Sequence, residues 1–501
     1  MLRSLRGLVA GLLPNSNEPN YELIHSNGNS SPMSTIYTIN DDTFSHLKLS
    51  FTRFLFFLIP SPIQRRLQPA HFKAQRLYAT SYLDGLRGVA SLIVFFCHYT
   101  EGNVQFMIPS YGLPIGDPVP SSFMQLPFLR VLYSGRPMVH IFFVISGFVL
   151  SLKPLKLARA HNYADLQTTL SSSVFRRGMR LFLPTTASTF MVMIFIRMRL
   201  VGIEGFETAS QQFMDWLHAI WTIAYSWDWD KIWWPKYDVH VWTIPIEMAQ
   251  SMFLFITITG LARCKVWIRL FMFVVIMLYS LKCGRWAAFE FIGGALVAEV
   301  GLIQQVRAER NSNKEMPVSD GESSNSWQTS VVYAFWSMNF VFAMWIAGWP
   351  NNDVLRTPGL SEIAPYTMEP YWSQRRQEEQ AFSWFALGAM QVVFACQQLP
   401  LLQKFFTSGP AQYLANISYA LYLMHGPFLD VFAHRWMPIV WWVVGGRENS
   451  GMWTRTFAWW GGMLGLAVPI FWASDMFWRA VDIPSVEFAK WLEGKCIVKE
   501  D

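Results

Sequence analysis

The chain has 501 residues, of which 52% are apolar and only 15% are charged. Soluble globular domains carry about 25% charged residues, so the composition excludes a string of soluble domains and favours a polytopic membrane protein. The net charge of +6 is small, and basic residues gathered on cytosolic loops account for it without a nucleic-acid partner. Five scattered cysteines follow neither a disulfide framework nor a metal-binding spacing, so no metal site is expected.

Residues 1–47 are rich in Asn, Ser and Thr and poor in large apolar side chains, which predicts a disordered, cytosolic N-terminal segment. They lack the small-residue cleavage pattern of a signal peptide. Residues 48–80 begin with an apolar stretch too short to cross a bilayer and continue with several basic residues. We expect an interfacial helix there, followed by a basic lead-in to the membrane domain.

A helix that crosses a bilayer needs about 20 mostly apolar residues. Ten segments approach that length and composition, and we expect each of them to span the membrane. They are residues 83–102, 137–153, 181–200, 240–260, 266–282, 286–304, 328–349, 381–400, 413–433 and 455–477. The shorter, Trp-rich residues 436–445 suit an interfacial or re-entrant segment.

Lysine and arginine concentrate before the first span, between the second and third, between the fourth and fifth, and after the tenth. By the positive-inside rule these loops and both termini face the cytosol. The expected fold is all-α: a polytopic bundle of about ten transmembrane helices over residues 81–484, with a cytosolic tail over residues 485–501. An endomembrane such as the endoplasmic reticulum is the expected location.

The first span carries polar residues that a lipid-facing helix would avoid. Arg87 and His98 are eleven residues apart, and at about 100° per residue they project from nearly the same face. Asp84 joins that face and is placed to orient the guanidinium of Arg87. Because such side chains are costly in lipid, we expect the face to line a shared polar cavity. The alternative is an arginine that reaches a helix end and a structural histidine.

A second cluster lies in the sequence VFRRGMRLFLP. Arg177 and Arg180 are three residues apart at the expected cytosolic start of the third span, where two guanidinium groups side by side suit a phosphate or carboxylate. A plain positive-inside anchor is the alternative.

Two later spans hold further candidates. Glu247 lies inside an apolar segment, and His240 precedes it by seven residues on the same face of the helix. A carboxylate within the membrane is a functional candidate. The alternative is that Glu247 is a structural partner for an arginine. Trp242 lines the pocket or belongs to the interfacial belt. The sequence ISYALYLMHGPF adds Tyr422 and His425, the latter catalytic or structural.

The sequence contains no Gly-rich phosphate loop, no HExxH zinc helix and no Gly-x-Ser-x-Gly nucleophile elbow. What remains is a histidine base, arginines for an anionic ligand and a buried carboxylate. This set suits group transfer to a hydroxyl group that the histidine deprotonates. Acyl-CoA fits as a co-substrate because its phosphates need arginines, and no tightly bound cofactor is expected.

Six motifs together resemble the acyltransferase-3 family of integral membrane O-acyltransferases, in the family's order, between residues 81 and 484. They are LDGLRGVASLIVFFCH, FFVISGFVLS, RGMR, WTIPIE, FIGGALVAE and SYALYLMHGPF. The Trp-rich loops and the C-terminal segment resemble fungal members more than bacterial ones. Thr243 and Pro245 depart from the Ser and non-proline residues that bacterial members usually have.

The resemblance implies a ten-helix bundle that moves an acyl group, usually acetyl, from cytosolic acyl-CoA to a hydroxyl. It places five residues in the site: Arg87, His98, Arg177, Arg180 and Glu247. We expect His98 to act as general base, Arg177 and Arg180 to hold the CoA phosphates, Arg87 and Asp84 to shape the donor channel, and Glu247 to position the acceptor or the base.

Some fungal relatives resemble tailoring enzymes, so the expected acceptor is a small hydroxylated natural product of secondary metabolism. His240, Trp242, Tyr422 and His425 are expected to contact it. One alternative is acylation of a glycan or cell-envelope carbohydrate. Alternatives from other classes are a proton-coupled transporter or acyl-chain exporter and a non-catalytic membrane scaffold. The sequence leaves the oligomeric state open.

Overall fold

The computed structural model describes residues 51–69, 76–113, 121–225, 227, 234–312, 326–373, 377–447 and 451–498. The chain divides into two units, Met1–Arg76 and Leu77–Asp501. In the first unit the described residues form a helical stretch over 51–58 and α3 (Ser61–Leu67). The helix expected within residues 48–60 is therefore present, whereas the expected disordered segment, residues 1–47, lies outside the described residues.

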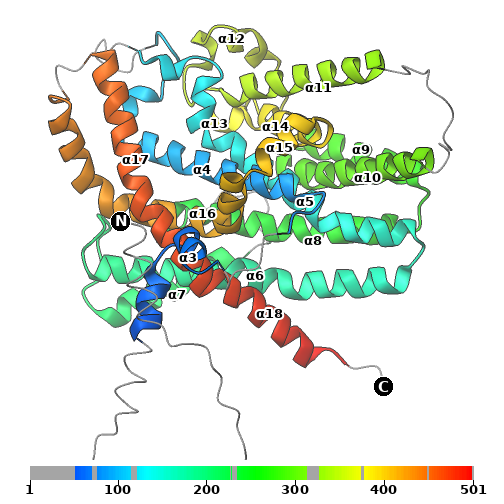
Figure 1. Cartoon of the computed structure of the whole chain (residues 1–501), viewed down its shortest axis with the longest axis horizontal. Coiled ribbons are helices and arrows are strands. Elements are labelled where there is room, and N and C mark those ends of the chain that lie inside the picture. The colour runs from blue at the N-terminus through cyan, green and yellow to red at the C-terminus, as the bar shows by residue number, and fades with distance from the viewer. Residues whose placement is uncertain are drawn as a thin grey trace, which may run out of the picture. The chain divides into compact units, whose positions relative to one another are not determined.

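Every regular element that the structure describes in the second unit is a helix (Figure 1). The long helices are α4 (Ser81–Asn103), α5 (Gly135–Arg159), α6 (Tyr163–Arg197), α7 (Ala209–Ala224), α8 (Thr243–Leu261), α9 (Val266–Lys282), α10 (Trp286–Ser312), α11 (Ser326–Ala347), α14 (Phe382–Gln398), α16 (Gly409–Val443), α17 (Met452–Phe477) and α18 (Ile483–Cys496). Short α-helices are α12 (Leu360–Ile363), α13 (Gln377–Gln380) and α15 (Pro400–Phe406). Short 3-10 turns are η2 (Gln105–Met107), η3 (Phe123–Gln125), η4 (Leu129–Tyr133), η5 (Val239–Trp242), η6 (Val354–Arg356) and η7 (Ala364–Tyr366), and η8 (Trp478–Asp482) is a π-helical turn.

The all-helical membrane class is confirmed. Among the described residues, six helices are long and apolar enough to cross a bilayer, or seven if the bent pair α14 and α15 forms one span. Each of the ten expected ranges falls on a helix, but α4, α9 and α16 are not among the six. Helices α4 and α16 carry polar candidate residues, and α9 has only 17 residues. The count of ten and the cytosolic termini therefore stay predictions.

The third expected span begins much earlier than its apolar pattern suggested. Helix α6 runs unbroken from Tyr163 to Arg197, and the Asn162 side chain caps its start by accepting a hydrogen bond from the Asp165 amide. Residues 163–180 are polar enough to look like a loop, yet they contain no proline. The Arg177 and Arg180 cluster consequently lies within a continuous helix and not at a helix start.

One further expectation needs correction. Residues 436–445 do not form a separate re-entrant segment, because most of them continue α16, which accommodates Pro427 and Pro438 within its 35 residues. In the region expected as a cytosolic tail, residues 485–501, α18 extends to Cys496, and the cytosolic location stays a prediction. The amphipathic helix α7, which packs against α6 and α8, was not expected at all.

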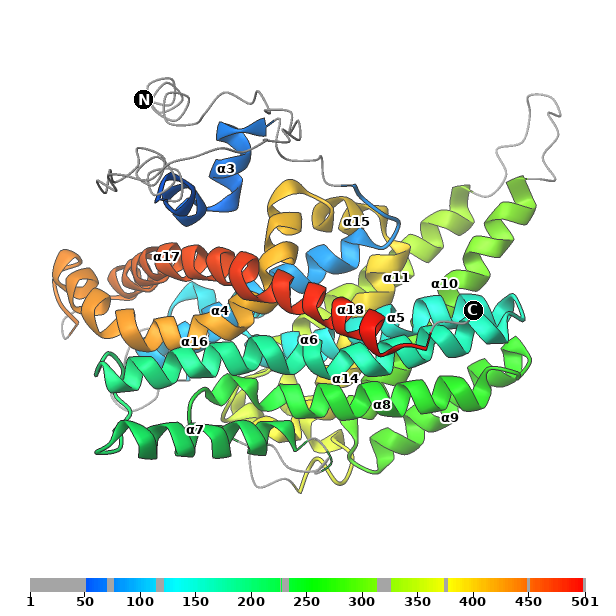
Figure 2. The same ribbon diagram turned by 90° about the horizontal axis from the view of Figure 1, so that it is seen from below.

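Helix α4 lies at the junction of the bundle, packed against α16 on one side and α5 on another. Helices α6 and α8 run side by side, as Figure 2 shows, and α5 contacts both. Helices α5 and α10 approach closely because each has a glycine at the contact: a Cβ on Gly147 or Gly294 would lie 2.2 Å from a carbonyl oxygen of the other helix. The FFVISGFVLS and FIGGALVAE motifs thus have a packing role.

Charged side chains inside the bundle are paired. The Oε1 atom of Glu299 on α10 accepts from Arg269 Nη2 at 2.8 Å and from Arg159 Nη1 at 3.1 Å. The Arg269 and Glu299 side chains are 1% and 0% exposed, whereas Arg159 is 21% exposed. This triad ties α5, α9 and α10 together.

Substitution of Arg269 tests the importance of the triad. Removing one partner of a buried ion pair leaves a buried charge and costs about 3–5 kcal/mol, so Arg269→Met lowers the free energy of unfolding by about that amount. Arg159→Met, which removes the more exposed partner of Glu299, lowers the free energy of unfolding far less. Thermal denaturation of the purified protein in detergent measures both, and equal losses would contradict a dominant role for Arg269.

Candidate active site

A cavity of about 260 Å³ lies among α4, α5, α6, α8, α16 and the start of α18. Five of its lining residues are of charged types: Arg87, Arg177, Arg180 and Glu247 from three helices, and Asp482 from η8. Its other walls are mainly apolar residues of α5 and aromatic residues of α16. An apolar cavity with a few convergent charged groups is the usual form of a small-molecule site.

Arg177 and Glu247 form an ion pair in this cavity. Arg177 Nη2 lies 2.6 Å from Glu247 Oε1, and its Nε donates to Ser251 Oγ at 2.9 Å. Ser146 on α5 donates to the same carboxylate oxygen at 3.1 Å. Because both charges are mostly buried, with 11% and 23% of their side chains exposed, the pair fixes α6 against α8 and holds both groups at the cavity wall.

The other two arginines of the cavity are less constrained. Arg87 forms an ion pair with Asp84 at 3.4 Å, as its helical spacing predicted, and both side chains are substantially exposed. No hydrogen bond or ion pair joins Arg180 to another residue that the structure describes, although Asp482 lines the same cavity. Arg180 is therefore a cation free to bind an anionic ligand.

Tyr422 separates the cavity from a cluster of histidines. It lines the cavity, and its hydroxyl donates to the backbone carbonyl of His240. The same hydroxyl lies 2.7 Å from Thr243 Oγ1, which must then be the donor in that bond. The Tyr422 ring is centred 6.1 Å from that of His425. The charged cavity and the histidines are therefore adjacent, with one tyrosine between them.

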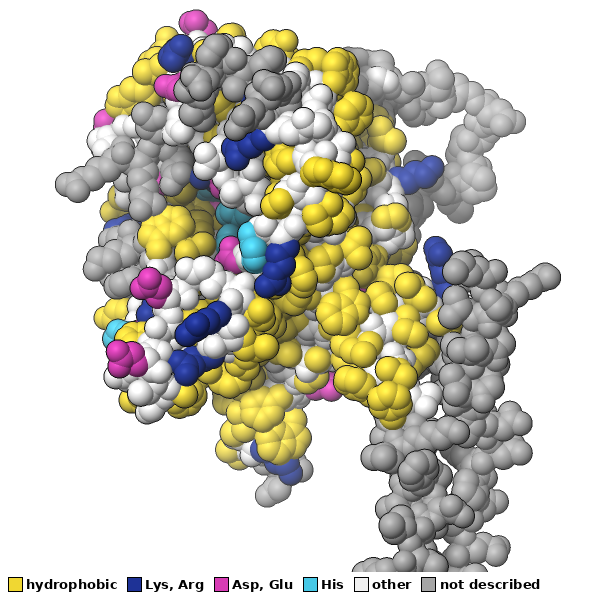
Figure 3. Space-filling view, turned by 90° about the vertical axis from the view of Figure 1, so that its left-hand side faces the viewer, with side chains coloured by type: hydrophobic (Ala, Val, Ile, Leu, Met, Phe, Trp, Pro, Cys, Tyr) yellow, Lys and Arg dark blue, Asp and Glu magenta, His cyan; other side chains and the backbone are white. Residues whose placement is uncertain are grey.

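Three histidines from distant parts of the chain meet beyond Tyr422. The ring centroid of His98 on α4 lies 4.2 Å from that of His240 and 5.3 Å from that of His425, and the last two are 4.5 Å apart. His98 is the most accessible, with 34% of its side chain exposed, compared with 14% for His240. Figure 3 shows histidine side chains inside a hollow on the face that it presents.

A carboxylate orients His240. Asp238 Oδ1 lies 2.7 Å from the His240 Nδ1 atom and also accepts from the His240 backbone amide at 2.9 Å. The ring packs directly on the α16 backbone, where a Cβ on Gly426 would lie 2.3 Å from Nδ1. Glycine at position 426 is thus required for His240 to reach the cluster.

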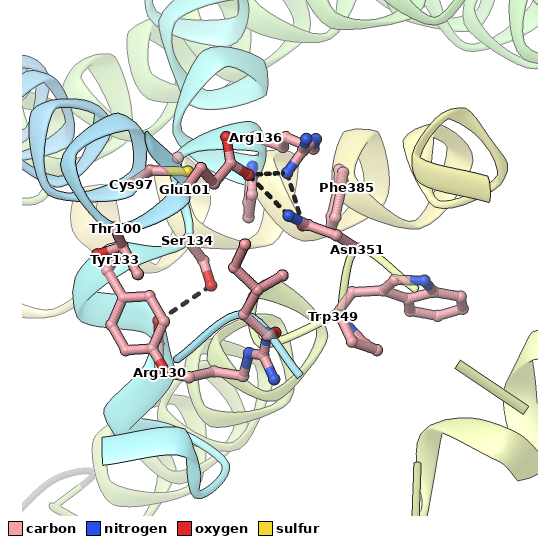
Figure 4. Close-up of a pocket in the computed structure, with 14 residues that line it drawn as sticks. Cys97, Thr100, Glu101, Arg130, Tyr133, Ser134, Arg136, Trp349, Asn351 and Phe385 are labelled. Atoms are coloured by element: carbon pink, nitrogen blue, oxygen red, sulfur yellow. Dashed lines mark hydrogen bonds and ion pairs between the residues drawn. The ribbon is translucent and has the colours of Figure 1, made fainter. Parts of the chain in front are cut away.

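A second carboxylate stands behind His98. Glu101 Oε2 lies 3.6 Å from His98 Nδ1, one helical turn away. Glu101 Oε1 accepts hydrogen bonds from Arg136 Nη1 and Asn351 Nδ2, both at 2.7 Å, and these three side chains form the network drawn in Figure 4. With its carboxylate held in this way, Glu101 places negative charge beside Nδ1 of His98, which favours a proton on that nitrogen.

The structure divides the predicted site residues into two groups. Arg87, Arg177, Arg180, Glu247 and Tyr422 line the cavity; His98, His240 and His425 form the adjacent cluster. The single shared cavity expected for Arg87 and His98 is not found, since His98 does not line it. Trp242 lines neither group and has its ring 6.4 Å from that of Trp286. The roles predicted for these residues remain predictions.

Sequence reasoning missed Glu101 and Asp238, and it offered an arginine partner for Glu247 only as an alternative, without identifying Arg177. Glu101 follows His98 by three residues in a helix, and this spacing was a usable signal. Asp238 precedes His240 by two residues, which suits an aspartate that caps the following turn. The pairing of Glu247 required knowledge of how α6 and α8 align.

Substitution at Gly426 tests how closely His240 is packed. Gly426→Ala places a methyl group against the imidazole, and such overpacking typically costs 1–3 kcal/mol. Gly409→Ala on the same helix is the matched control, because a Cβ there meets no atom within 4 Å. Thermal denaturation measures the difference, and equal stability of the two variants would show that the ring does not lie where described.

Comparison with known proteins gives a family match. Residues 80–479 match the model of the family described as "Acyltransferase domain" (Acyl_transf_3). No solved structure matches the chain.

Three curated fungal proteins are similar over most of their length. O-acetyltransferase PaAT-1 of Phomopsis amygdali is 28% identical over 462 residues, covering 85% of this chain and 86% of that protein. Acyltransferase clz18 of Cochliobolus lunatus is 24% identical, covering 71% of this chain and 85% of that protein. Acyltransferase R4 of a Phoma species is 24% identical, covering 84% of this chain and 97% of that protein.

Proposed function

The chain belongs to the acyltransferase family that matches residues 80–479, and on this premise we propose that it moves an acyl group from cytosolic acyl-CoA to a hydroxyl group of a small molecule. The observation that carries the proposal is the position of His98. It pairs with Glu101 and packs against His240 and His425, which both contact Tyr422 at the wall of a cavity with three arginines. The protein is thus an acyltransferase enzyme with a donor site and a base in adjacent places.

The arginine cavity is the proposed donor site. Its volume of about 260 Å³ lies below the roughly 300–1,000 Å³ of pockets that enclose a whole small molecule. It therefore suits the acyl-bearing arm of acyl-CoA, with the nucleotide outside. Arg180 is unpaired and exposed, so it is available to the phosphates, whereas Arg177 is engaged by Glu247 and serves mainly to shape the wall.

His98 is the proposed general base. Its Nε2 lone pair accepts the proton of the acceptor hydroxyl while the oxygen attacks the thioester carbonyl carbon. The new C–O bond forms, the C–S bond breaks, and His98 returns the proton to the CoA sulfur. Glu101 stabilises the imidazolium that forms between these two steps, because its carboxylate faces Nδ1.

The acceptor is proposed to be a small hydroxylated natural product, and the acyl group acetyl. The support is the name of one relative, an O-acetyltransferase, and the aromatic ring of Tyr422, which is centred 6.1 Å from that of His425 in the cluster. The His98 side chain is 34% exposed, which leaves it accessible to an acceptor.

Replacement of His98 is the primary test. His98→Ala removes the base, so turnover of labelled acetyl-CoA with an extract of host metabolites falls by about 10²–10⁴-fold. His434→Ala, an exposed histidine on α16, keeps wild-type turnover. Normal turnover by His98→Ala would refute the assignment, and uptake of unmodified substrate into proteoliposomes without CoA release would indicate a transporter instead.

Replacement of Arg180 tests the donor site. Arg180→Gln raises the KM for acetyl-CoA by roughly tenfold, about the 1.4 kcal/mol expected for one charge-assisted contact, and leaves the KM for acetyl-pantetheine, which lacks the phosphates, unchanged. Arg263→Gln, an exposed arginine between α8 and α9, alters neither. An equal rise for both donors would mean that Arg180 does not contact the phosphates.

A further inference from the structure

The three histidines beyond Tyr422 share a geometry that general-base catalysis by one of them does not require. One ring nitrogen from each lies within 4.8 Å of those of the other two. They come from α4, η5 and α16, so the fold and not a local motif brings them together. This is why a search for closely spaced metal ligands in the sequence found none.

Each ring has its Nδ1 atom turned toward an oxygen. The partner is Asp238 Oδ1 at 2.7 Å for His240, the Leu421 carbonyl at 3.1 Å for His425, and Glu101 Oε2 at 3.6 Å for His98. Histidines that bind metals nearly always donate the other ring N–H to a carboxylate or a carbonyl, as the first two contacts allow, and Glu101 is close enough for small movements to complete the third. On each ring Nε2 is then the nitrogen that no described oxygen occupies.

His425 supplies the second, independent observation. Its side chain is fully enclosed, at 1% exposure, and its Nε2 atom has no hydrogen-bond partner among the described residues. A buried polar atom without a partner costs about 1–3 kcal/mol. A ligand that accepts this lone pair would remove that cost, whereas a purely structural histidine would be expected to satisfy it within the protein.

We propose that the Nε2 atoms of His98, His240 and His425 bind one divalent transition-metal ion, with zinc as the preferred ion. Three imidazoles with an open fourth position suit zinc, and bonds of about 2.0–2.1 Å would draw the nitrogens to about 3.4 Å apart. Small ring rotations achieve this. Asp238 and Glu101 supply negative charge just outside the ligands, which strengthens binding of a dication.

Zinc at this place opposes the proposed reaction. The Nε2 lone pair of His98 cannot bind zinc and accept the acceptor proton at once, so an occupied site has no general base. The cluster is then a reversible inhibitory site. This consequence rests on the proposed function, whereas zinc binding itself does not.

Zinc binding is tested on the purified, metal-stripped full-length protein in detergent. Equilibration with Zn²⁺ and removal of the excess should leave one zinc per chain, measured by elemental analysis. His425→Ala and His240→Ala should weaken binding at least tenfold, and Asp238→Asn, which keeps all three ligands, by 10–100-fold. His434→Ala should bind as wild type. Zinc stoichiometry and affinity that are the same in all four variants would overturn the site.

Cobalt provides a readout that does not depend on turnover. Co²⁺ in a four-coordinate nitrogen site gives visible absorption bands, which should appear with wild type and with His434→Ala and be absent from His425→Ala. Bands of equal strength in all three proteins, or in none, would overturn the assignment of the ligands. Circular dichroism of each variant separates loss of the site from loss of the fold.

Turnover measures the inhibition separately. Zinc should reduce acyl transfer by wild type with half-inhibition at the concentration that half-fills the site, and a chelator should restore the rate. Full turnover with zinc bound would overturn the inhibitory role. If no donor supports transfer by wild type in the absence of metal, the proposed function fails, while the zinc stoichiometry still decides the metal site.

Discussion

The arrangement of the candidate site depends on two carboxylates that turn imidazole rings inward. Polar groups in membrane-embedded helices are tolerated where partners satisfy them, and Glu101 and Asp238 are those partners for His98 and His240. Each places negative charge beside Nδ1 of its histidine and so favours a proton on that nitrogen. Glu101 is in turn fixed by Arg136 and Asn351 (Figure 4). Without these contacts the two rings would have no preferred tautomer and no fixed orientation in the cluster.

The rest of the structure brings the histidine cluster next to the charged cavity, which is the proposed donor site. Helix α16 does most of the joining, because Tyr422 borders the charged cavity while His425, one turn later, belongs to the cluster. Helix α4 joins them as well, with Arg87 at one end and His98 at the other. The paired Arg177 and Glu247 hold α6 and α8 at the width that the cavity requires.

Sequence periodicity located the helices well because long apolar stretches have few other stable forms in a membrane. It failed where composition and structure diverge. The polar first half of α6 looks like a loop, and the end of α16 looks like a separate segment because Pro427 and Pro438 interrupt it. In both cases packing against neighbouring helices and continuous backbone hydrogen bonds maintain the helix. A hydropathy profile detects neither of these.

The site was partly predictable for a related reason. Arg87, His98 and Glu247 stood out because charged or titratable groups are rare in apolar helices, and the i, i+3 pairing of Asp84 with Arg87 followed from helical geometry. Contacts between helices could not be read in this way. The three-histidine cluster and the pairing of Arg177 with Glu247 depend on the register of α4, α6, α8 and α16, which no local pattern encodes.

The central claim is that the imidazole of His98 removes the proton from the acceptor hydroxyl. The most direct measurement is acyl transfer by His98→Ala in the presence of free imidazoles of increasing basicity, which can enter the partly exposed space that the side chain vacates. The rate should rise with both the concentration and the basicity of the added base. A rate indifferent to every imidazole, in a folded variant that binds acyl-CoA as wild type does, would contradict it.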